Sequence, residues 1–197
     1  METDHETWMR QAIAEGELAR GSTGDNPWVG CVIVDAPGKV VGRGHTQGPG
    51  EDHAEIEALA QAEAAGISLA EATLYSTLEP CSFHGRTPAC SRAILARGVR
   101  RVVLGMRDPH PRVDGEGARI LRDGGATVLE GVCEAEVRRQ LGPWVFTFHP
   151  HEPLRRAGEL SAAQGETDVA AALMQLYAVD LPRALEVARR ARGGAVR

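Results

Sequence analysis

The feature that most constrains this 197-residue chain is a set of soft metal donors divided between two segments. His53-Ala54-Glu55 supplies an imidazole and a carboxylate, and Pro80-Cys81 and Cys90 follow with two thiols. Zn²⁺ prefers thiolate and imidazole ligands in a tetrahedron, and three protein ligands leave the fourth position free for water. A fold that uses this set must bring His53, Cys81 and Cys90 to one point. The pattern predicts a zinc site of the open, catalytic type.

Glu55 has two interpretations. It is too close to His53 in the sequence to be a comfortable fourth ligand, but it can take a proton from a water that the metal activates. Asp52-x-x-Glu55 also fits a capping box, in which Glu55 only bonds back to the cap residue. With a histidine and two cysteines at hand, we favour the catalytic role for Glu55.

A structural zinc would instead be closed by a fourth protein ligand. The candidates are His84, Cys31 and Cys133. Cys31 lies inside an apolar run and Cys133 at the start of a late helix, so we expect both to be packing residues. His84 is the one credible fourth ligand, and the open site is favoured over it.

Helical and strand patterns alternate through most of the chain. Asp52 is expected to cap a helix that begins at His53. Thr87 is expected to cap a helix that begins at Pro88. Long helices between the later strands imply parallel neighbours there, with the first two strands antiparallel and the second at an edge. We therefore predict an α/β fold with helices at 3–20, 53–65, 88–97, 116–123 and 133–140, and strands at 29–34, 39–44, 72–78, 102–106 and 127–130.

His-x-Glu followed by Pro-Cys resembles the zinc deaminases of nucleobases, except that eight residues instead of two separate Cys81 from Cys90. The resemblance is narrowed to the riboflavin-pathway pyrimidine deaminases by segments 77–82 and 85–88 with Cys90, by 26–34 upstream and by 108–115 downstream. The likeness runs from about residue 5 to about residue 148. It implies a three-layer α/β/α cytidine-deaminase-like fold with a mixed sheet of about five strands, and Zn²⁺ as the cofactor.

The resemblance also implies a reaction and substrate contacts. In that family the domain removes an amino group by hydrolysis from 2,5-diamino-6-ribosylamino-4(3H)-pyrimidinone 5′-phosphate. The family's asparagine at the position of Asn26 contacts the pyrimidine, and a basic residue at the position of Arg86 lies near the ribose phosphate. We add His84 and Asp108 as substrate contacts. The alternatives are a turn residue for Asn26 and a solvated arginine for Arg86.

Two positions depart from the family, which usually has histidine where Thr46 and Phe83 stand. His45 and His84 lie one place away, so either the loops are locally shifted or a different pyrimidine is recognised. The alternative functions are a deaminase of a related diaminopyrimidine nucleotide or nucleoside in a specialised pathway, and a non-catalytic zinc-containing partner of a separate reductase. An RNA-editing deaminase of the same fold is disfavoured by the acidic charge and the long loop between the cysteines.

Composition favours a small-molecule substrate. The net charge of −5 and a pI near 5.8 give no basic surface of the kind that nucleic acids require. The acidic start has no apolar run, so neither a signal peptide nor a membrane span is expected, and cytoplasmic residence follows. Four cysteines then indicate metal ligands or core residues, and not disulfides.

Residues 1–150 are expected to form the zinc deaminase domain. Residues 151–197 are expected to be a C-terminal helical tail, with helices from Thr167 to Tyr177 and from about Pro182, and not an independent domain. The tail is too short for the reductase domain that commonly follows in the family. We expect a homo-oligomer, either a dimer or a tetramer. Because the chain lacks a reductase domain, a separately encoded reductase is the candidate protein partner.

Overall fold

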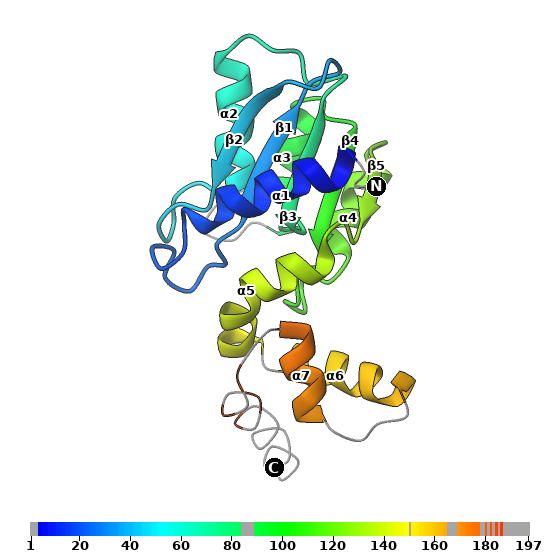
Figure 1. Cartoon of the computed structure of the whole chain (residues 1–197). Helices are drawn as coiled ribbons and strands as arrows, with labels where there is room; N and C mark the ends of the chain where they lie inside the picture. The colour runs from blue at the N-terminus through cyan, green and yellow to red at the C-terminus, as the bar shows by residue number, and fades with distance from the viewer. Residues whose placement is uncertain are drawn as a thin grey trace. The chain divides into compact units, whose positions relative to one another are not determined.

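A five-stranded mixed sheet organises the first of the two units into which the chain divides, residues 1–137 and 138–197 (Figure 1). The structure is a computed structural model, and it describes residues 4–83, 89–149, 151–164 and 169–177 together with residues 180, 182, 184 and 186. Among these residues, no helix has the length and apolar character needed to cross a bilayer.

The sheet has the order β2-β1-β3-β4-β5. β1 pairs antiparallel with both β2 and β3, whereas β3, β4 and β5 run parallel. This confirms the predicted antiparallel first pair, the edge position of the second strand and the parallel later strands. The strands are β1 (Gly30–Val34), β2 (Val40–His45), β3 (Thr73–Leu78), β4 (Arg101–Met106) and β5 (Thr127–Glu130).

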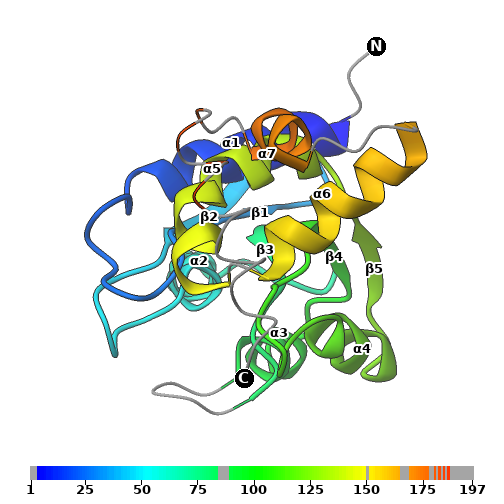
Figure 2. The same cartoon turned by 90° about the horizontal axis from the view of Figure 1, so that it is seen from below.

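Helices cover both faces of this sheet, as Figure 2 shows from below. One face carries α1 (Asp4–Glu17) and the first turn of α5 (Glu134–Phe148), and the other carries α2 (Ala54–Ala64), α3 (Cys90–Ala96) and α4 (Glu116–Asp123). All five residues of β1 are buried, which explains its continuous apolar run. The three-layer α/β/α prediction is confirmed.

Two glycines allow helices to lie unusually close to the sheet. A Cβ on Gly30 would lie 1.9 Å from the carbonyl oxygen of Ala12 in α1. A Cβ on Gly44 would lie 2.3 Å from the carbonyl oxygen of Ala54, the first residue of α2. Only glycine permits these approaches, so Gly44 sets the distance between β2 and the start of α2.

One predicted helix cap is wrong, and another lies outside the described residues. The N-cap of α2 is His53 and not Asp52, and no side chain caps this end. The Asp52 carbonyl accepts a hydrogen bond from the Gln47 amide at 3.0 Å, which holds Asp52 in the preceding loop. α3 begins at Cys90 with Ala89 as its N-cap. The predicted cap at Thr87 lies outside the described residues.

The second unit is more helical than predicted. α5 was expected to end at Gln140, before Gly142 and Pro143, but it continues to Phe148. A further helix, α6 (His151–Gln164), occupies a stretch that carries no predicted helix. α7 (Val169–Tyr177) matches the predicted helix, and Pro182, Ala184 and Glu186 are helical, as expected of the last one.

A buried core holds the second unit together. The Phe146 ring meets Tyr177 edge to face at 5.1 Å, and Leu173 is fully buried. The nearly buried carboxylate of Glu152 is paired with Arg155 at 2.7 Å and Arg156 at 2.8 Å. The division into a deaminase domain, 1–150, and a tail, 151–197, stays a prediction.

The close approach at Gly44 predicts that Gly44→Ala destabilises the protein by about 1–3 kcal/mol, because the added methyl must displace the α2 backbone. Denaturant unfolding measures this difference. Gly48→Ala is the control, since the atom nearest to its Cβ belongs to the flexible Glu51 carboxylate at 3.1 Å. Its expected change is below about 0.5 kcal/mol. Equal effects of the two substitutions would contradict the packing argument.

Candidate active site

The register of the sheet brings four loops to one edge. Gly30 pairs with His45, Cys31 with Ser76, and Ser76 with Leu104. The amino end of β1 therefore coincides with the carboxyl ends of β2, β3 and β4. Loops at the carboxyl ends of parallel strands are where ligands bind in open α/β sheets. Asn26, Thr46, Cys81 and Asp108 all emerge at this edge.

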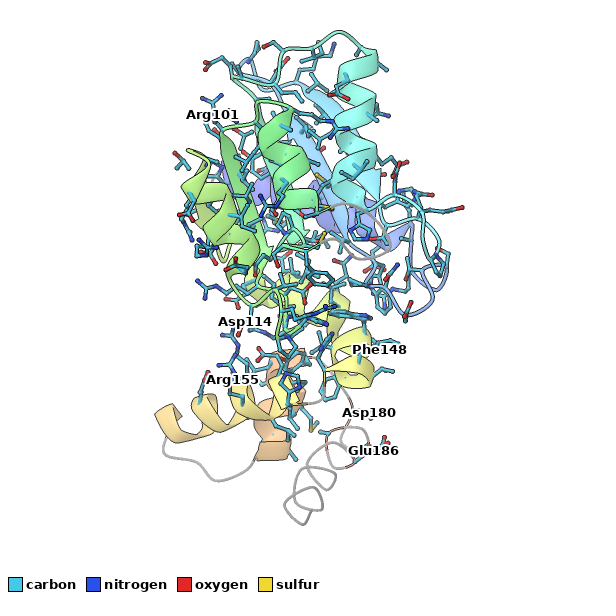
Figure 3. All side chains as sticks on the ribbon, turned by 180° about the vertical axis from the view of Figure 1, so that it is seen from behind. Arg101, Asp114, Phe148, Arg155, Asp180 and Glu186 are labelled. Atoms are coloured by element: carbon cyan, nitrogen blue, oxygen red, sulfur yellow. The ribbon has the colours of Figure 1, made fainter. Side chains whose placement is uncertain are left out.

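The three predicted metal donors meet at the same edge. The Nδ1 atom of His53 lies 3.3 Å from Sγ of Cys90 and 3.8 Å from Sγ of Cys81. The three donor atoms all lie within 4.8 Å of one another. They come from the N-cap of α2, the loop after β3 and the first residue of α3, and these two helices lie side by side on one face of the sheet (Figure 3). One imidazole and two thiols are a donor set that fits Zn²⁺.

The first turn of α3 holds Cys81 in place. The amide of Cys90 donates to Sγ of Cys81 at 3.2 Å. The amide and hydroxyl of Ser91 both donate to the Cys81 carbonyl, at 3.2 and 3.0 Å. Free N–H groups at a helix start favour an anionic ligand such as thiolate. The helix start thus positions one cysteine and supplies the other.

The contact between the Cys81 and Cys90 sulfurs shifts their pKa values in opposite directions. The thiol of Cys90 donates to Cys81, and with the adjacent His53 this lowers the pKa of Cys81 to about 4. The same contact, together with burial, raises the pKa of Cys90 well above its usual value. The Cys81 contact raises the pKa of His53. A cation that binds both sulfurs must therefore displace the Cys90 proton.

Glu55 is buried, with 4% of its surface exposed, in the first turn of α2. Burial raises the pKa of its carboxyl, and the nearby His53 imidazole partly opposes this rise. Because His53 is the N-cap and no side chain caps α2, the predicted alternative of a capping box is wrong. A buried carboxyl with a raised pKa beside a metal site is suited to holding and releasing a proton.

The described residues supply no fourth metal ligand. Among them, His53, Cys81 and Cys90 form the only group of three or more metal donors. Cys31 is fully buried in β1, and Cys133 donates its thiol to the Glu6 carbonyl at 3.8 Å, so neither joins the group. Two predicted site residues, His84 and Arg86, lie outside the described residues. A closed site completed by His84 therefore stays an untested alternative.

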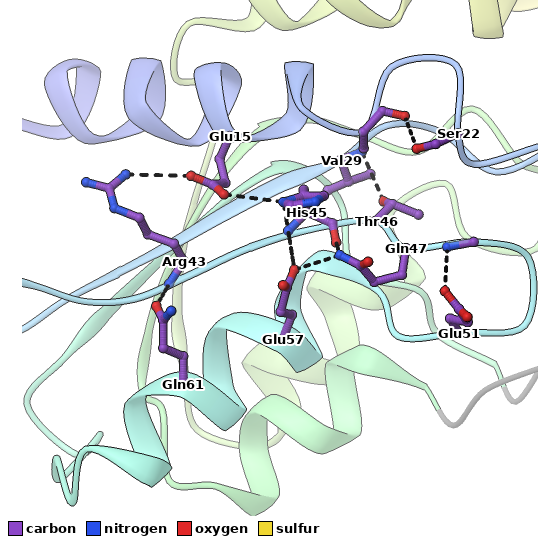
Figure 4. Close-up of polar contacts among 12 residues, drawn as sticks. Glu15, Ser22, Val29, Arg43, His45, Thr46, Gln47, Glu51, Glu57 and Gln61 are labelled. Carbon is purple, nitrogen blue, oxygen red and sulfur yellow. Dashed lines mark hydrogen bonds and ion pairs between the residues drawn. The ribbon is translucent and has the colours of Figure 1, made fainter.

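His45 does not take the place of Thr46. Its Nδ1 lies 3.3 Å from a Glu15 oxygen of α1, and its amide donates to Glu57 at 2.7 Å (Figure 4). Thr46 is buried, and its hydroxyl oxygen accepts from the Val29 amide at 3.1 Å. The His45 Nδ1 also lies 3.9 Å from a Glu57 oxygen, so the imidazole is held between the carboxylates of Glu15 in α1 and Glu57 in α2, which argues against a local shift of this loop.

A buried carboxylate that sequence reasoning missed shapes the loop after β4. Glu79 is 2% exposed and accepts hydrogen bonds from the amides of Asp108, Gly115 and Ala118, at 3.3, 2.9 and 3.0 Å. The sequence signal that could have identified Glu79 is its position, two residues before the metal-donor Cys81. Glu79 fixes the path of the loop that carries Asp108.

The other two predicted substrate contacts lie at this edge. Asp108 accepts a hydrogen bond from the His110 amide at 2.8 Å, and burial raises the pKa of its carboxyl to about 7. Asn26 closes a turn in which the Thr23 hydroxyl donates to its carbonyl at 2.7 Å. Its side chain is partly exposed. The turn fixes the backbone and leaves the Asn26 amide available for other contacts.

Comparisons with known proteins agree with this geometry. Residues 2–106 match the model of the cytidine and deoxycytidylate deaminase zinc-binding region. The chain is 43% identical over 145 residues to the riboflavin biosynthesis protein RibD of Aquifex aeolicus, a match that covers 74% of this chain and 39% of that protein. It is 41% identical over 132 residues to the diaminohydroxyphosphoribosylamino-pyrimidine deaminase of Buchnera aphidicola, covering 67% of this chain and 87% of that protein.

A solved structure gives the same result. The chain matches a diaminohydroxyphosphoribosylaminopyrimidine deaminase/5-amino-6-(5-phosphoribosylamino)uracil reductase from Thermotoga maritima with a TM-score of 0.69 and 38% identity, over 73% of this chain and 40% of that one. The chain thus spans about two fifths of the length of the RibD-type proteins that it matches. It belongs to the cytidine and deoxycytidylate deaminase family, among the relatives of the riboflavin-pathway pyrimidine deaminases.

Proposed function

We propose that this chain is a zinc-dependent deaminase that removes an amino group by hydrolysis from an aminopyrimidine ribotide of riboflavin biosynthesis. The observation that carries the proposal is the convergence of His53, Cys81 and Cys90 within 4.8 Å, next to the buried Glu55. The name and high coverage of the Buchnera relative support the same substrate class.

His53, Cys81 and Cys90 would hold the Zn²⁺. Bound there, the ion lowers the pKa of a water molecule so that the water can act as a nucleophile near neutral pH. The Glu55 carboxylate takes one proton from the attacking water and delivers it to the ring nitrogen beside the attacked carbon. It then takes the second proton from the new hydroxyl group and passes it to the amino group, which leaves as ammonia when the carbon–nitrogen bond breaks. Its raised pKa suits both directions of transfer.

The substrate contacts complete the proposal. The Asn26 amide can both donate to and accept from the pyrimidine edge. Arg86 would meet the ribose phosphate, while His84 and Asp108 would make further contacts with the substrate. Asn26 and Asp108 belong to loops at the edge where the metal donors lie.

The alternative substrate is a related diaminopyrimidine nucleotide or nucleoside of a specialised pathway. It is favoured by Thr46 and Phe83, which replace two histidines that are usual in the family. An RNA substrate is disfavoured by the net charge of −5. The third alternative is a non-catalytic zinc protein that serves a separate reductase, and it would require a protein ligand such as His84 in the position of the water.

The proposal also includes a cellular compartment and protein partners. Two thiolate ligands suit a reducing compartment such as the cytoplasm. None of the four cysteines, all of which the structure describes, forms a disulfide. A homo-oligomer, and a separately encoded reductase that consumes the product, remain parts of the proposal.

The reaction is tested by following ammonia release from a panel of aminopyrimidine nucleotides and their nucleosides. We expect the fastest turnover with the 2,5-diamino-6-ribosylamino-4(3H)-pyrimidinone 5′-phosphate. A clear preference for a nucleoside would move the assignment to the specialised pathway. No turnover of any member by zinc-loaded protein would support the non-catalytic alternative.

The donor set predicts one tightly held zinc per chain, with most of it lost in Cys81→Ser because two ligands cannot close a stable site. Elemental analysis of purified protein measures the metal content. Cys133→Ser is the matched control and should retain the metal, since the Cys133 thiol donates to the Glu6 carbonyl and is not part of the donor group. Equal zinc content in the two variants would exclude Cys81 as a ligand.

The position of Glu55 predicts that Glu55→Gln keeps the fold and the zinc but lowers kcat by about 10²–10⁴-fold, because an amide preserves shape and cannot carry protons. Steady-state kinetics and metal analysis are measured on the same preparation. Glu63→Gln, which alters a carboxylate paired with Arg97 on the exposed side of the same helix, is expected to leave kcat unchanged. A Glu55→Gln enzyme with a near wild-type rate would refute the proton-transfer role.

A further inference from the structure

Phe83 joins two loops beside the metal donors. It lies two residues after Cys81, and its ring centroid is 4.0 Å from the guanidinium carbon of Arg112. On the same loop, the His110 ring lies 5.6 Å from the Phe83 ring. The Ser82 hydroxyl donates to the Arg112 carbonyl at 2.9 Å. These four residues, Ser82, Phe83, His110 and Arg112, are called the Phe83 cluster below.

The backbone around Arg112 is fixed as well. The Arg112 amide donates to Nδ1 of His110 at 3.1 Å, and the turn closes with a bond of 2.8 Å from the Val113 amide to the His110 carbonyl. Glu79 anchors both ends of this loop through the amides of Asp108 and Gly115. Arg112 is thus an exposed side chain on a well-fixed backbone. Figure 3 marks the loop by its neighbour Asp114.

The charge of Arg112 is not neutralised by a carboxylate. Among the described residues it forms no ion pair, whereas nearby arginines do: Arg107 and Arg122 pair with Glu130, and Arg119 pairs with Glu116. The adjoining segment 84–88 contains no acidic residue. Instead, the Arg112 guanidinium lies over the face of the Phe83 ring. In this position, its N–H groups at the edge of the ring are able to bind an anion.

The position of the Phe83 cluster suits the phosphate end of a nucleotide substrate. When a pyrimidine ring reacts at the metal, its ribose phosphate must lie outside the donor group but close to it. The Phe83 cluster meets this condition, because Ser82 directly follows the donor Cys81 and bonds to the Arg112 backbone.

We propose that Arg112 is a specificity-determining residue that binds the phosphate of the substrate, with Phe83 holding its guanidinium in position. This inference rests on the proposed function and adds a residue to it. Arg112 contributes to binding and not to proton transfer. Its loss should therefore raise KM for a phosphorylated substrate while kcat stays unchanged.

The test compares Arg112→Gln with Arg92→Gln, a matched loss of charge at an exposed position on α3. Calorimetry with the zinc-loaded protein measures binding of ribose 5-phosphate, with ribose as the uncharged probe. We expect Arg112→Gln to weaken ribose 5-phosphate binding by about tenfold or more and Arg92→Gln to leave it unchanged. Phe83→Leu keeps the charge of Arg112 and removes the aromatic ring. It should also weaken ribose 5-phosphate binding, but by less than Arg112→Gln.

Kinetics on the same proteins gives the second measurement. Arg112→Gln should raise KM for the aminopyrimidine nucleotide by about tenfold or more and leave KM for its nucleoside unchanged. Equal behaviour of Arg112→Gln and Arg92→Gln, or no binding of ribose 5-phosphate by the wild-type protein, would overturn the role of Arg112. Phosphate binding that depends on Arg112, without deamination of any aminopyrimidine, would overturn the proposed function alone.

Discussion

The hydrogen bonds between the first turn of α3 and Cys81 are the constraint on which the site depends. Cys81 lies three residues beyond β3, in a loop, and without partners its sulfur would have no fixed position. The amides of Cys90 and Ser91 and the Ser91 hydroxyl supply these partners. The third donor, His53, is brought to the same place by the close approach of α2 to Gly44. Backbone contacts, more than packing of the donors themselves, thus create the site.

Buried negative charge gathers at this edge of the sheet. Glu55 and Glu79 are almost fully buried, and Asp108 is mostly shielded. Three backbone amides compensate Glu79, one amide partly compensates Asp108, and burial raises the pKa of both Glu55 and Asp108. Carboxylates in a low dielectric require compensation by hydrogen bonds or cations. A divalent cation between the three donors would supply the remaining compensation, so the surroundings favour metal binding as much as the donors do.

The periodic part of the fold was predictable, and the long-range part was not. The predicted bounds of α4 and β5 match the structure, because glycines delimit short, clearly patterned segments. The spacing of histidine and cysteines identified three donors that the structure brings together, although their roles stay proposals. The cap at Asp52 failed because its carbonyl closes a loop with Gln47. α5 passes through Gly142-Pro143 because tertiary packing can override local propensity. Glu79 could not be recognised, since its partners lie 29 to 39 residues further along the chain.

The two departures from the family pattern have different physical meanings. Thr46 is buried and its hydroxyl oxygen accepts a hydrogen bond from the Val29 amide, so this position carries a side chain bonded to the backbone in place of an imidazole. Phe83 is partly exposed and replaces a histidine with a ring that contacts Arg112 and His110 across a loop boundary. Both positions lie in loops, so under the proposed function we expect differences in substrate preference between this chain and its relatives to arise there, and not at the donor group or Glu55.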